Sequence, residues 1–226
     1  MYNKIKVGVF LPDYRKLRFN NITSKDFRHL FLLLFWVIYL LSFFVLERIV
    51  VTEYTPIYSR LDDIIPFCEF FIIPYVFWYL YLVIIHLYTL KNDIESFEKL
   101  MYFLILSFGI ATVVFAVFPN EQNLRPTEFM RDNIFTDTVK FLYVIDTNTN
   151  VCPSLHVVGS LAVLFTAWNT KGLNKPLYRI IFLICAVLII LSTVFLKQHS
   201  VVDIFAGILL SIAVYPFAFI IPNKLK

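Results

Sequence analysis

The chain has 226 residues, of which 59% are hydrophobic and 16% are charged. Soluble domains average about 45–50% apolar and about 25% charged residues, so this composition excludes a water-soluble globule. The 25 Phe and 13 Tyr residues exclude intrinsic disorder, because disordered chains are poor in aromatic residues. We therefore expect a protein whose surroundings are mostly lipid.

The cysteines and the net charge exclude further classes. The three cysteines lie far apart and form no Cys-x-x-Cys pair, so we expect neither a disulfide framework nor a zinc site. The formal net charge is +4. This excess does not indicate a nucleic-acid partner, because the basic residues are distributed as membrane topology requires.

Six apolar segments are candidates for membrane-spanning helices. Crossing about 30 Å of hydrocarbon takes about 20 mostly apolar residues in a helix. The fourth segment is the weakest, because it is short and opens on Ser154 and His156. The segments are 29–46, 67–90, 100–118, 154–170, 178–196 and 203–221. We predict an all-α integral membrane protein, with a basic cytoplasmic segment at 1–28 and a six-span domain at 29–226.

The Lys and Arg residues set the expected orientation. Most of them precede the first span or lie in the connections and tail on the same side of the membrane. By the positive-inside rule this side is cytoplasmic, and both termini lie there. The first span lacks a small-residue cleavage site, so we interpret it as an uncleaved signal anchor. The compact chain without targeting extensions favours a bacterial plasma membrane.

The longest connection, 119–153, lies on the outer side in this topology. Long loops in compact proteins are usually functional or disordered. The apolar-periodic stretch from Phe129 to Val144 indicates a short helix on the membrane surface. The outer segments 119–126, 152–156 and 192–203 are expected to converge, which makes their polar residues a candidate site.

His199 and Asp203 are the first candidates within these segments. Residues four apart on a helix share one face. A carboxylate that accepts from one imidazole nitrogen leaves the other nitrogen free as a base or nucleophile. Taken alone, the pair favours a simpler alternative, a histidine that caps or hydrogen-bonds near the start of the sixth span.

The remaining candidates are suited to binding phosphate. Ser154 is placed as the N-cap of a helix that carries His156, and the free amides of a first helical turn attract anions. Arg125, beside a proline, offers a guanidinium for bidentate phosphate contact. Lys197 offers an ammonium at the outer boundary. The alternatives are helix punctuation for Ser154, a solvated loop arginine for Arg125 and a snorkelling lysine for Lys197.

In this order and topology the motifs resemble the type 2 phosphatidic acid phosphatase superfamily. Its integral-membrane branch contains lipid phosphate phosphatases related to vanadium haloperoxidases. The family pattern is Lys-x6-Arg-Pro, Pro-Ser-x-His and Ser-Arg-x5-His-x3-Asp. The matching positions are Arg125, Pro126, Pro153, Ser154, His156, Ser192, His199 and Asp203. The resemblance implies a six-helix membrane fold of that family, with its site at the outer face.

The resemblance also implies a role for each residue. His199 would attack phosphorus and form a phosphohistidine, Asp203 would orient it, and His156 would act as general acid and then base. The phosphate would be bound by Arg125, Ser154 and Lys197. No metal or other cofactor is expected, and the expected partners are a lipid phosphate or polyprenyl diphosphate and membrane lipids.

Two positions depart from the family pattern. The family lysine corresponds to Phe118 and the family arginine of the third motif to Thr193. Third motifs that lack this arginine also occur in the inositol phosphorylceramide synthase-like branch, whose members transfer a phospho-headgroup between lipids. A headgroup transferase and a non-catalytic membrane protein therefore stay open as alternatives to the phosphatase.

Overall fold

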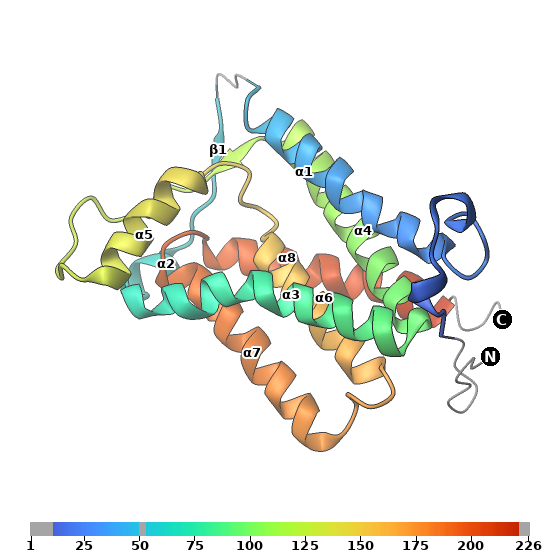
Figure 1. Ribbon diagram of the computed structural model, residues 1–226. Coiled ribbons are helices and arrows are strands. Elements are labelled where there is room, and N and C mark those ends of the chain that lie inside the picture. The colour runs from blue at the N-terminus through green and yellow to red at the C-terminus, as the bar shows by residue number, and fades with distance from the viewer. Residues whose placement is uncertain (1–10, 50–52, 222–226) are drawn as a thin grey trace.

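The structure is a computed structural model that describes residues 11–49 and 53–221. Residues 1–10 of the predicted basic segment therefore lie outside the described residues. The described chain is mostly helical (Figure 1). Its α-helices are α1 (Leu34–Leu46), α2 (Arg60–Ile64), α3 (Ile72–Asn92), α4 (Ile94–Val117), α5 (Ile134–Ile145), α6 (Leu155–Asn169), α7 (Pro176–Phe195) and α8 (Val201–Tyr215). A 3-10 helix, η3 (Arg28–Leu33), leads into α1, and a π-helical turn, η5 (Pro216–Ile220), continues α8.

Within the described residues, five helical segments are long and apolar enough to cross a membrane. They are Arg28–Leu46, Glu69–Asn92, Ile94–Val117, Pro176–Phe195 and Val201–Ile220. The prediction of an all-helical membrane-spanning fold is confirmed. The fourth predicted span corresponds to α6, whose 15 residues cover only about 22 Å. Because α6 begins at Leu155, directly after a polar loop, it falls short of the length of the other spans.

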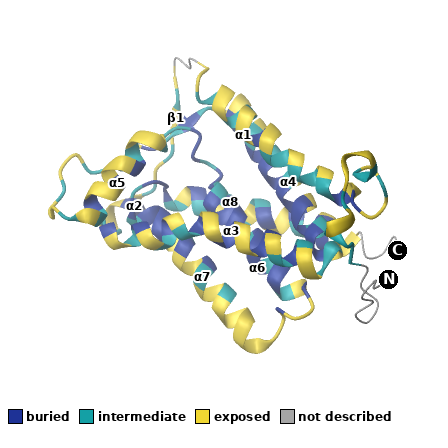
Figure 2. Cartoon of the chain, viewed as in Figure 1, coloured by how far each residue is buried: buried dark blue, intermediate teal, exposed yellow. Residues whose placement is uncertain are grey.

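The short helix α6 forms the centre of the bundle. It packs against α3, α4, α7 and α8, and most of its side chains are buried, whereas α1 and α7 expose apolar faces (Figure 2). Small residues allow this close packing, as they do between membrane helices generally. At Gly159, a Cβ atom would lie only 2.8 Å from the indole of Trp78 on α3.

Helix α1 packs on α4 and diverges from α3 (Figure 1). Only one residue of α1, Tyr39, is buried. Aromatic rings fill the space where α1 meets α4, including Tyr39 and Phe108 at a centroid distance of 5.1 Å. The amino-terminal helix therefore joins the core through one aromatic face and forms a wall beside the rest of the bundle.

The connections that carry the predicted site residues gather at one end of the bundle (Figure 1). There, β1 (Thr55–Pro56) pairs in parallel with β2 (Asn120–Glu121). The predicted surface helix is present as α5, which begins at Ile134 because the Asn133 side chain accepts from the first-turn amides. The buried residues Val139 and Leu142 pack α5 against the ends of α3 and α7, so it is part of the fold at this end.

We predict that Gly159→Ala lowers the stability of the protein. The added methyl group collides with Trp78, and overpacking of this kind typically costs about 1–3 kcal/mol. Gly109→Ala is the matched control, because no heavy atom lies within 4 Å of its Cβ position. Thermal unfolding in detergent should show a lower melting temperature for Gly159→Ala alone. Equal melting temperatures would contradict the close packing of α6 on α3.

Candidate active site

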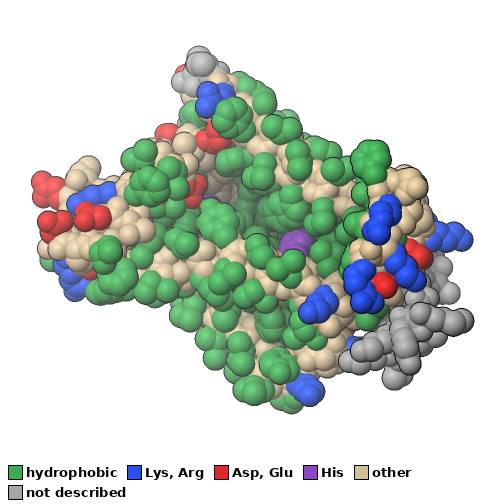
Figure 3. Space-filling view, in the orientation of Figure 1, with side chains coloured by type: hydrophobic (Ala, Val, Ile, Leu, Met, Phe, Trp, Pro, Cys, Tyr) green, Lys and Arg blue, Asp and Glu red, His purple; other side chains and the backbone are tan. Residues whose placement is uncertain are grey.

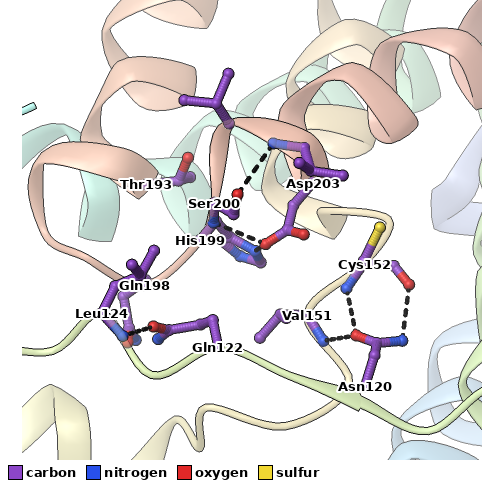
Figure 4. Close-up of polar contacts among 12 residues, drawn as sticks. Asn120, Gln122, Leu124, Val151, Cys152, Thr193, Gln198, His199, Ser200 and Asp203 are labelled. Carbon is purple, nitrogen blue, oxygen red and sulfur yellow. Dashed lines mark hydrogen bonds and ion pairs between the residues drawn. The ribbon is translucent and has the colours of Figure 1, made fainter. Parts of the chain in front are cut away.

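Hydrogen bonds join the three outer segments that the sequence predicts to converge. The side chain of Asn120 accepts from the backbone amides of Val151 at 2.9 Å and Cys152 at 2.8 Å, and donates to the carbonyl of Cys152 at 3.1 Å (Figure 4). Gln122 donates to the backbone carbonyl of Lys197 at 2.9 Å. The segment 119–126 therefore connects the loop before α6 to the loop between α7 and α8.

The turn between α7 and α8 places His199. The backbone amide of Gln198 donates to the carbonyl of Thr193 at 2.9 Å, and that of Lys197 donates to Val194 at 3.1 Å. These two bonds form a Schellman motif, in which the residue after the helix takes a left-handed conformation. Here that residue is Lys197, at a φ of 55°. The turn ends α7 and directs His199 towards the start of α8.

A capping box on α8 then orients the His199 ring. Ser200 is the N-cap, and the carboxylate of Asp203 accepts from its backbone amide at 2.9 Å. The same carboxylate oxygen lies 3.1 Å from Nδ1 of His199 (Figure 4). A carboxylate can only accept, so Nδ1 carries the proton and Nε2 keeps its lone pair. The pairing that was predicted is present.

The reason given for that pairing was wrong. The sequence argument placed His199 and Asp203 on one face of a helix, whereas α8 begins only at Val201. His199 lies in the loop, and Asp203 reaches back from the first helical turn, as the third residue of a capping box does.

Asp62, on α2, holds the start of α8 from the other side. It is buried, and its carboxylate accepts from the hydroxyl of Ser200 at 2.6 Å and the amide of Val201 at 2.8 Å. It also accepts from the amide of Ser59 at 2.7 Å, which caps α2 itself. Two carboxylates thus fix Ser200, the residue directly after His199.

His156 lies in the first turn of α6 and is enclosed by aromatic rings. Its ring stacks on Tyr75 at a centroid distance of 4.2 Å and lies 4.3 Å from the ring of Trp78. The centroids of His156 and His199 are 6.0 Å apart, with the planes at 61°. The two rings, which belong to segments far apart in the sequence, therefore lie next to each other.

Several buried polar atoms at this place have no hydrogen-bond partner among the described residues. They include Nε2 of His156, Oγ of Ser154 and Oε1 of Gln198. Unsatisfied buried polar groups are rare in native proteins and call for an explanation. Next to two histidines, they indicate a site for a polar ligand.

The rings of His156 and His199 line a cavity of about 580 Å³. At this end the lining is polar, with Asp146, Asn150 and Gln198, and it becomes apolar along α3 and α1. The described residues that line the cavity include no Lys or Arg. A phosphate bound at the rings would therefore meet imidazole, amide and backbone groups and the Asp146 carboxylate in place of a cluster of cations.

The predicted cation Arg125 does not line the cavity. Its guanidinium donates to the carbonyls of Tyr143 and Asp146 at the end of α5 and lies over the Tyr143 ring at 4.4 Å. A cation at the carboxyl end of a helix is favoured by the helix dipole. Burial lowers the pKa of Arg125, and the charge of Asp146 partly opposes this shift.

Lys197 and Ser154, the other predicted phosphate ligands, also lie outside the cavity lining. The ammonium of Lys197 donates to the carbonyls of Asp62 at 2.6 Å and Ile65 at 2.5 Å, at the end of α2. Burial lowers the pKa of this ammonium, against the effect of Asp62 and Asp63. Ser154 is the N-cap of α6 by backbone position, but its hydroxyl makes no cap bond. The structure thus unites His156, His199 and Asp203, and the phosphate-binding roles of the other three stay predictions.

The two departures from the family pattern do not supply a substitute cation. The hydroxyl of Thr193 donates back to the carbonyl of Ile190 at 2.7 Å. Phe118 is the C-cap of α4 and its side chain is exposed. Neither position therefore holds a cation. Phe118 has no polar group, and the Thr193 hydroxyl is bonded within its own helix.

Cys152 lies beside Asp203 but is not a nucleophile (Figure 4). Burial raises the pKa of its thiol to about 12, and the negative charge of Asp203 adds to this shift. Since the thiolate is the reactive form, this cysteine is inert at neutral pH. Among the residues that the structure describes, no group of three or more His, Cys, Asp or Glu is arranged to hold a metal ion.

Sequence reasoning missed four residues of this region. Tyr75 and Trp78 enclose His156, but within an aromatic-rich span they give no signal that separates them from lipid-facing residues. Asp146 accepts from the hydroxyl of Tyr75 at 2.6 Å, a contact across 71 positions that no local pattern predicts. Asp62 had a signal, since Ser59-x-x-Asp62 is a capping box.

We predict that Asp62→Ala destabilises the protein and lowers its activity. The substitution leaves the Ser200 hydroxyl and the Val201 amide without their acceptor, and a buried unsatisfied group costs about 1–3 kcal/mol. Asp63→Ala, at the exposed neighbouring position, is the control. Thermal unfolding would show a lower melting temperature for Asp62→Ala only. Equal losses in both variants would mean that Asp62 does not anchor α8.

We also predict that Lys197→Gly is more stable than Lys197→Ala by about 1 kcal/mol. Both variants lose the ammonium that binds the end of α2, but glycine takes the positive φ without strain. Unfolding measurements on the two proteins test the difference. If the alanine variant were the more stable one, the Schellman turn before His199 would be wrong.

Comparison with known proteins places the chain in a family. A model of the PAP2 superfamily matches residues 100–226, which include His156, His199 and Asp203. No curated protein and no solved structure shows a significant match. The match covers more than half of the chain and agrees with the helical membrane fold and the paired histidines. The protein therefore belongs to the PAP2 superfamily, the type 2 phosphatidic acid phosphatases, whose members are generally phosphatase-type hydrolases.

Proposed function

We propose that this protein is a lipid phosphate phosphatase that removes phosphate from a lipid phosphate or polyprenyl diphosphate through a phosphohistidine intermediate. One observation carries the proposal. The His199 ring, held by Asp203 at 3.1 Å, stands 6.0 Å from the His156 ring at the polar end of an apolar cavity. A nucleophile, its orienting carboxylate and a second imidazole are the groups that two-step phosphoryl transfer requires.

In the first step, Nε2 of His199 attacks phosphorus and the bond from phosphorus to the lipid oxygen breaks. Asp203 stabilises the positive charge that the ring acquires. The departing oxygen takes a proton from His156, which acts as general acid.

In the second step, water attacks the phosphohistidine and the bond between phosphorus and nitrogen breaks. His156, now neutral, removes a proton from the water, and inorganic phosphate leaves with both histidines restored. General acid–base help of this kind is worth about 10²–10⁴ in rate. Each step uses only side chains of this chain, in keeping with a metal-independent mechanism.

Charge stabilisation at the phosphoryl oxygens falls to neutral groups in this arrangement. The free backbone amides of the first turn of α6 lie next to the two rings. Arg125, Ser154 and Lys197 could bind phosphate as predicted only by changing their present contacts. Arg125 and Lys197 would have to give up their hydrogen bonds to helix carbonyls.

The proposed setting is the outer face of a bacterial plasma membrane, with both termini cytoplasmic. The distribution of Lys and Arg supports this orientation. The described ends of the chain lie at one end of the bundle, and the turn between α7 and α8, which carries His199, lies towards the other (Figure 1).

Headgroup transfer is the second candidate function. The described residues that line the cavity include no Lys or Arg, and this favours it. The same phosphohistidine chemistry would then use a lipid alcohol in place of water. Purified protein in detergent, given a phosphorylated lipid with and without a lipid acceptor, separates the two. Phosphate released without acceptor supports the phosphatase, and product formed only with acceptor supports the transferase.

We predict that His199→Ala lowers phosphate release at least about 10³-fold and that His156→Ala lowers it about 10²–10⁴-fold. The first variant lacks the nucleophile and the second lacks the proton donor. His29→Ala is the control, because His29 is also buried but pairs with Tyr14 near the other end of α3.

Phosphate release is measured with a lipid phosphate in detergent, together with trapping of acid-labile phosphoprotein. His199→Ala should form none, whereas wild type should. Equal rates for wild type and His199→Ala would show that the histidine is structural and that the protein is not this enzyme.

A further inference from the structure

The cavity that begins at the two histidines continues as a groove between α1 and α3. One wall is a continuous face of α3 that includes Tyr79, Leu82 and His86, and the other is the face of α1 that includes Trp36 and Leu40. The members of each face are three or four positions apart, which is the spacing of a single helix face. Figure 3 shows the surface hollowed in this region and surrounded by hydrophobic side chains.

Two contacts hold α1 across the groove and define its ends. At the histidine end, Glu47 accepts from the hydroxyl of Thr149 at 3.1 Å and the amide of Asn150 at 2.7 Å. At the other end, the indole N–H of Trp36 donates to Nε2 of His86 at 3.3 Å. Nδ1 of His86 is occupied by the carbonyl of Leu82 at 2.7 Å. The polar atoms of this crossing satisfy one another, so the groove between the two contacts has an apolar lining.

The two walls give the same length for this groove. The stretch from Trp36 on α1 to its C-cap Glu47, and the stretch from Tyr75 to His86 on α3, each correspond to about 16 Å at a rise of 1.5 Å per residue. This is about half of the 30 Å hydrocarbon core of a bilayer, and therefore about the length of an ordinary acyl chain in one leaflet. The groove thus matches one leaflet chain in length.

The volume of the cavity limits the number of chains. A methylene group occupies about the same space as a water molecule, roughly 30 Å³. The cavity of about 580 Å³ therefore accommodates one chain of ordinary length, with little room for a second. Any second chain of the substrate would have to remain in the surrounding lipid.

We propose that this groove binds one hydrocarbon chain of the substrate, with the phosphate at the histidines, and that the Trp36–His86 pair sets the chain length. The proposal rests on the proposed function and names its substrate class. That class is a lipid phosphate with an acyl chain of ordinary membrane length, in preference to a much longer polyprenyl phosphate. Leu33 and Leu90 line the cavity beyond the pair, so loss of the Trp36 side chain would lengthen the groove.

The experiment fills the groove without touching the histidines. Leu40→Trp places a large ring in the groove, and Ile38→Trp is the matched control on the same helix. The two residues are similarly exposed, at 60% and 63%, but Ile38 does not line the cavity. Phosphate release is measured with a short-chain alkyl phosphate, an acyl-length lysophosphatidate and a polyprenyl phosphate.

We expect Leu40→Trp to lower kcat/KM for the lysophosphatidate about tenfold or more, through loss of a few buried methylene contacts. With Leu40→Trp, kcat/KM for the short-chain probe should change by less than about twofold. With Ile38→Trp, kcat/KM for the short-chain probe and for the lysophosphatidate should each change by less than about twofold, since surface substitutions have small effects. Equal effects of the two tryptophan variants would overturn the proposal. So would a wild-type protein that hydrolyses the short and the acyl-length probes with the same kcat/KM.

Trp36→Ala provides the second test. It should raise kcat/KM for the polyprenyl phosphate relative to the lysophosphatidate by about tenfold, because the longer groove admits more of the chain. An unchanged ratio would overturn the role of the Trp36–His86 pair. Failure of the proposed function is distinct from either result, because it would appear as no His199-dependent phosphate release from the short-chain probe.

Discussion

The site depends on one carboxylate that serves two neighbours. Asp203 accepts from the Ser200 amide, which starts α8, and from Nδ1 of His199, which fixes the ring that faces the cavity. Because one oxygen does both, the His199 ring, the nucleophile of the proposed mechanism, is oriented by the same contact that begins the helix. Asp62 reinforces the arrangement through the Ser200 hydroxyl. A loop residue therefore gains the rigidity of a helix end, which preorganised catalysis requires.

The basic residues show how the fold uses its charges. Arg125 and Lys197 each bind carbonyls at the carboxyl end of a short helix, α5 and α2 respectively. These contacts hold the two small helices against the end of the bundle, where the outer loops meet. The polar end of the cavity is left with two imidazoles, neutral amides and the Asp146 carboxylate, which is a different electrostatic setting from the family pattern of several phosphate-binding cations.

Much of the fold and part of the site follow from local sequence. The apolar segments predicted as spans correspond to helices in the structure, and only α6 falls short of spanning length. The order of Ser154, His156, His199 and Asp203 identified the family that the superfamily match shows. The helix-face argument for His199 and Asp203 failed, because hydropathy alone does not locate the Schellman turn that ends α7. The partners of Arg125 and Lys197 lie 18 to 135 positions away, beyond the reach of any local pattern.

By itself the sequence determined the helices and the capping residues, because a helix in lipid satisfies its own backbone and a capping box acts over four residues. Only the tertiary structure decided which groups surround the chemistry. The enclosure of His156 by Tyr75 and Trp78, and the groove between α1 and α3, require side chains from separate helices to meet. Such contacts depend on how closely α6 packs and how far α1 diverges, and these distances are properties of the assembled bundle.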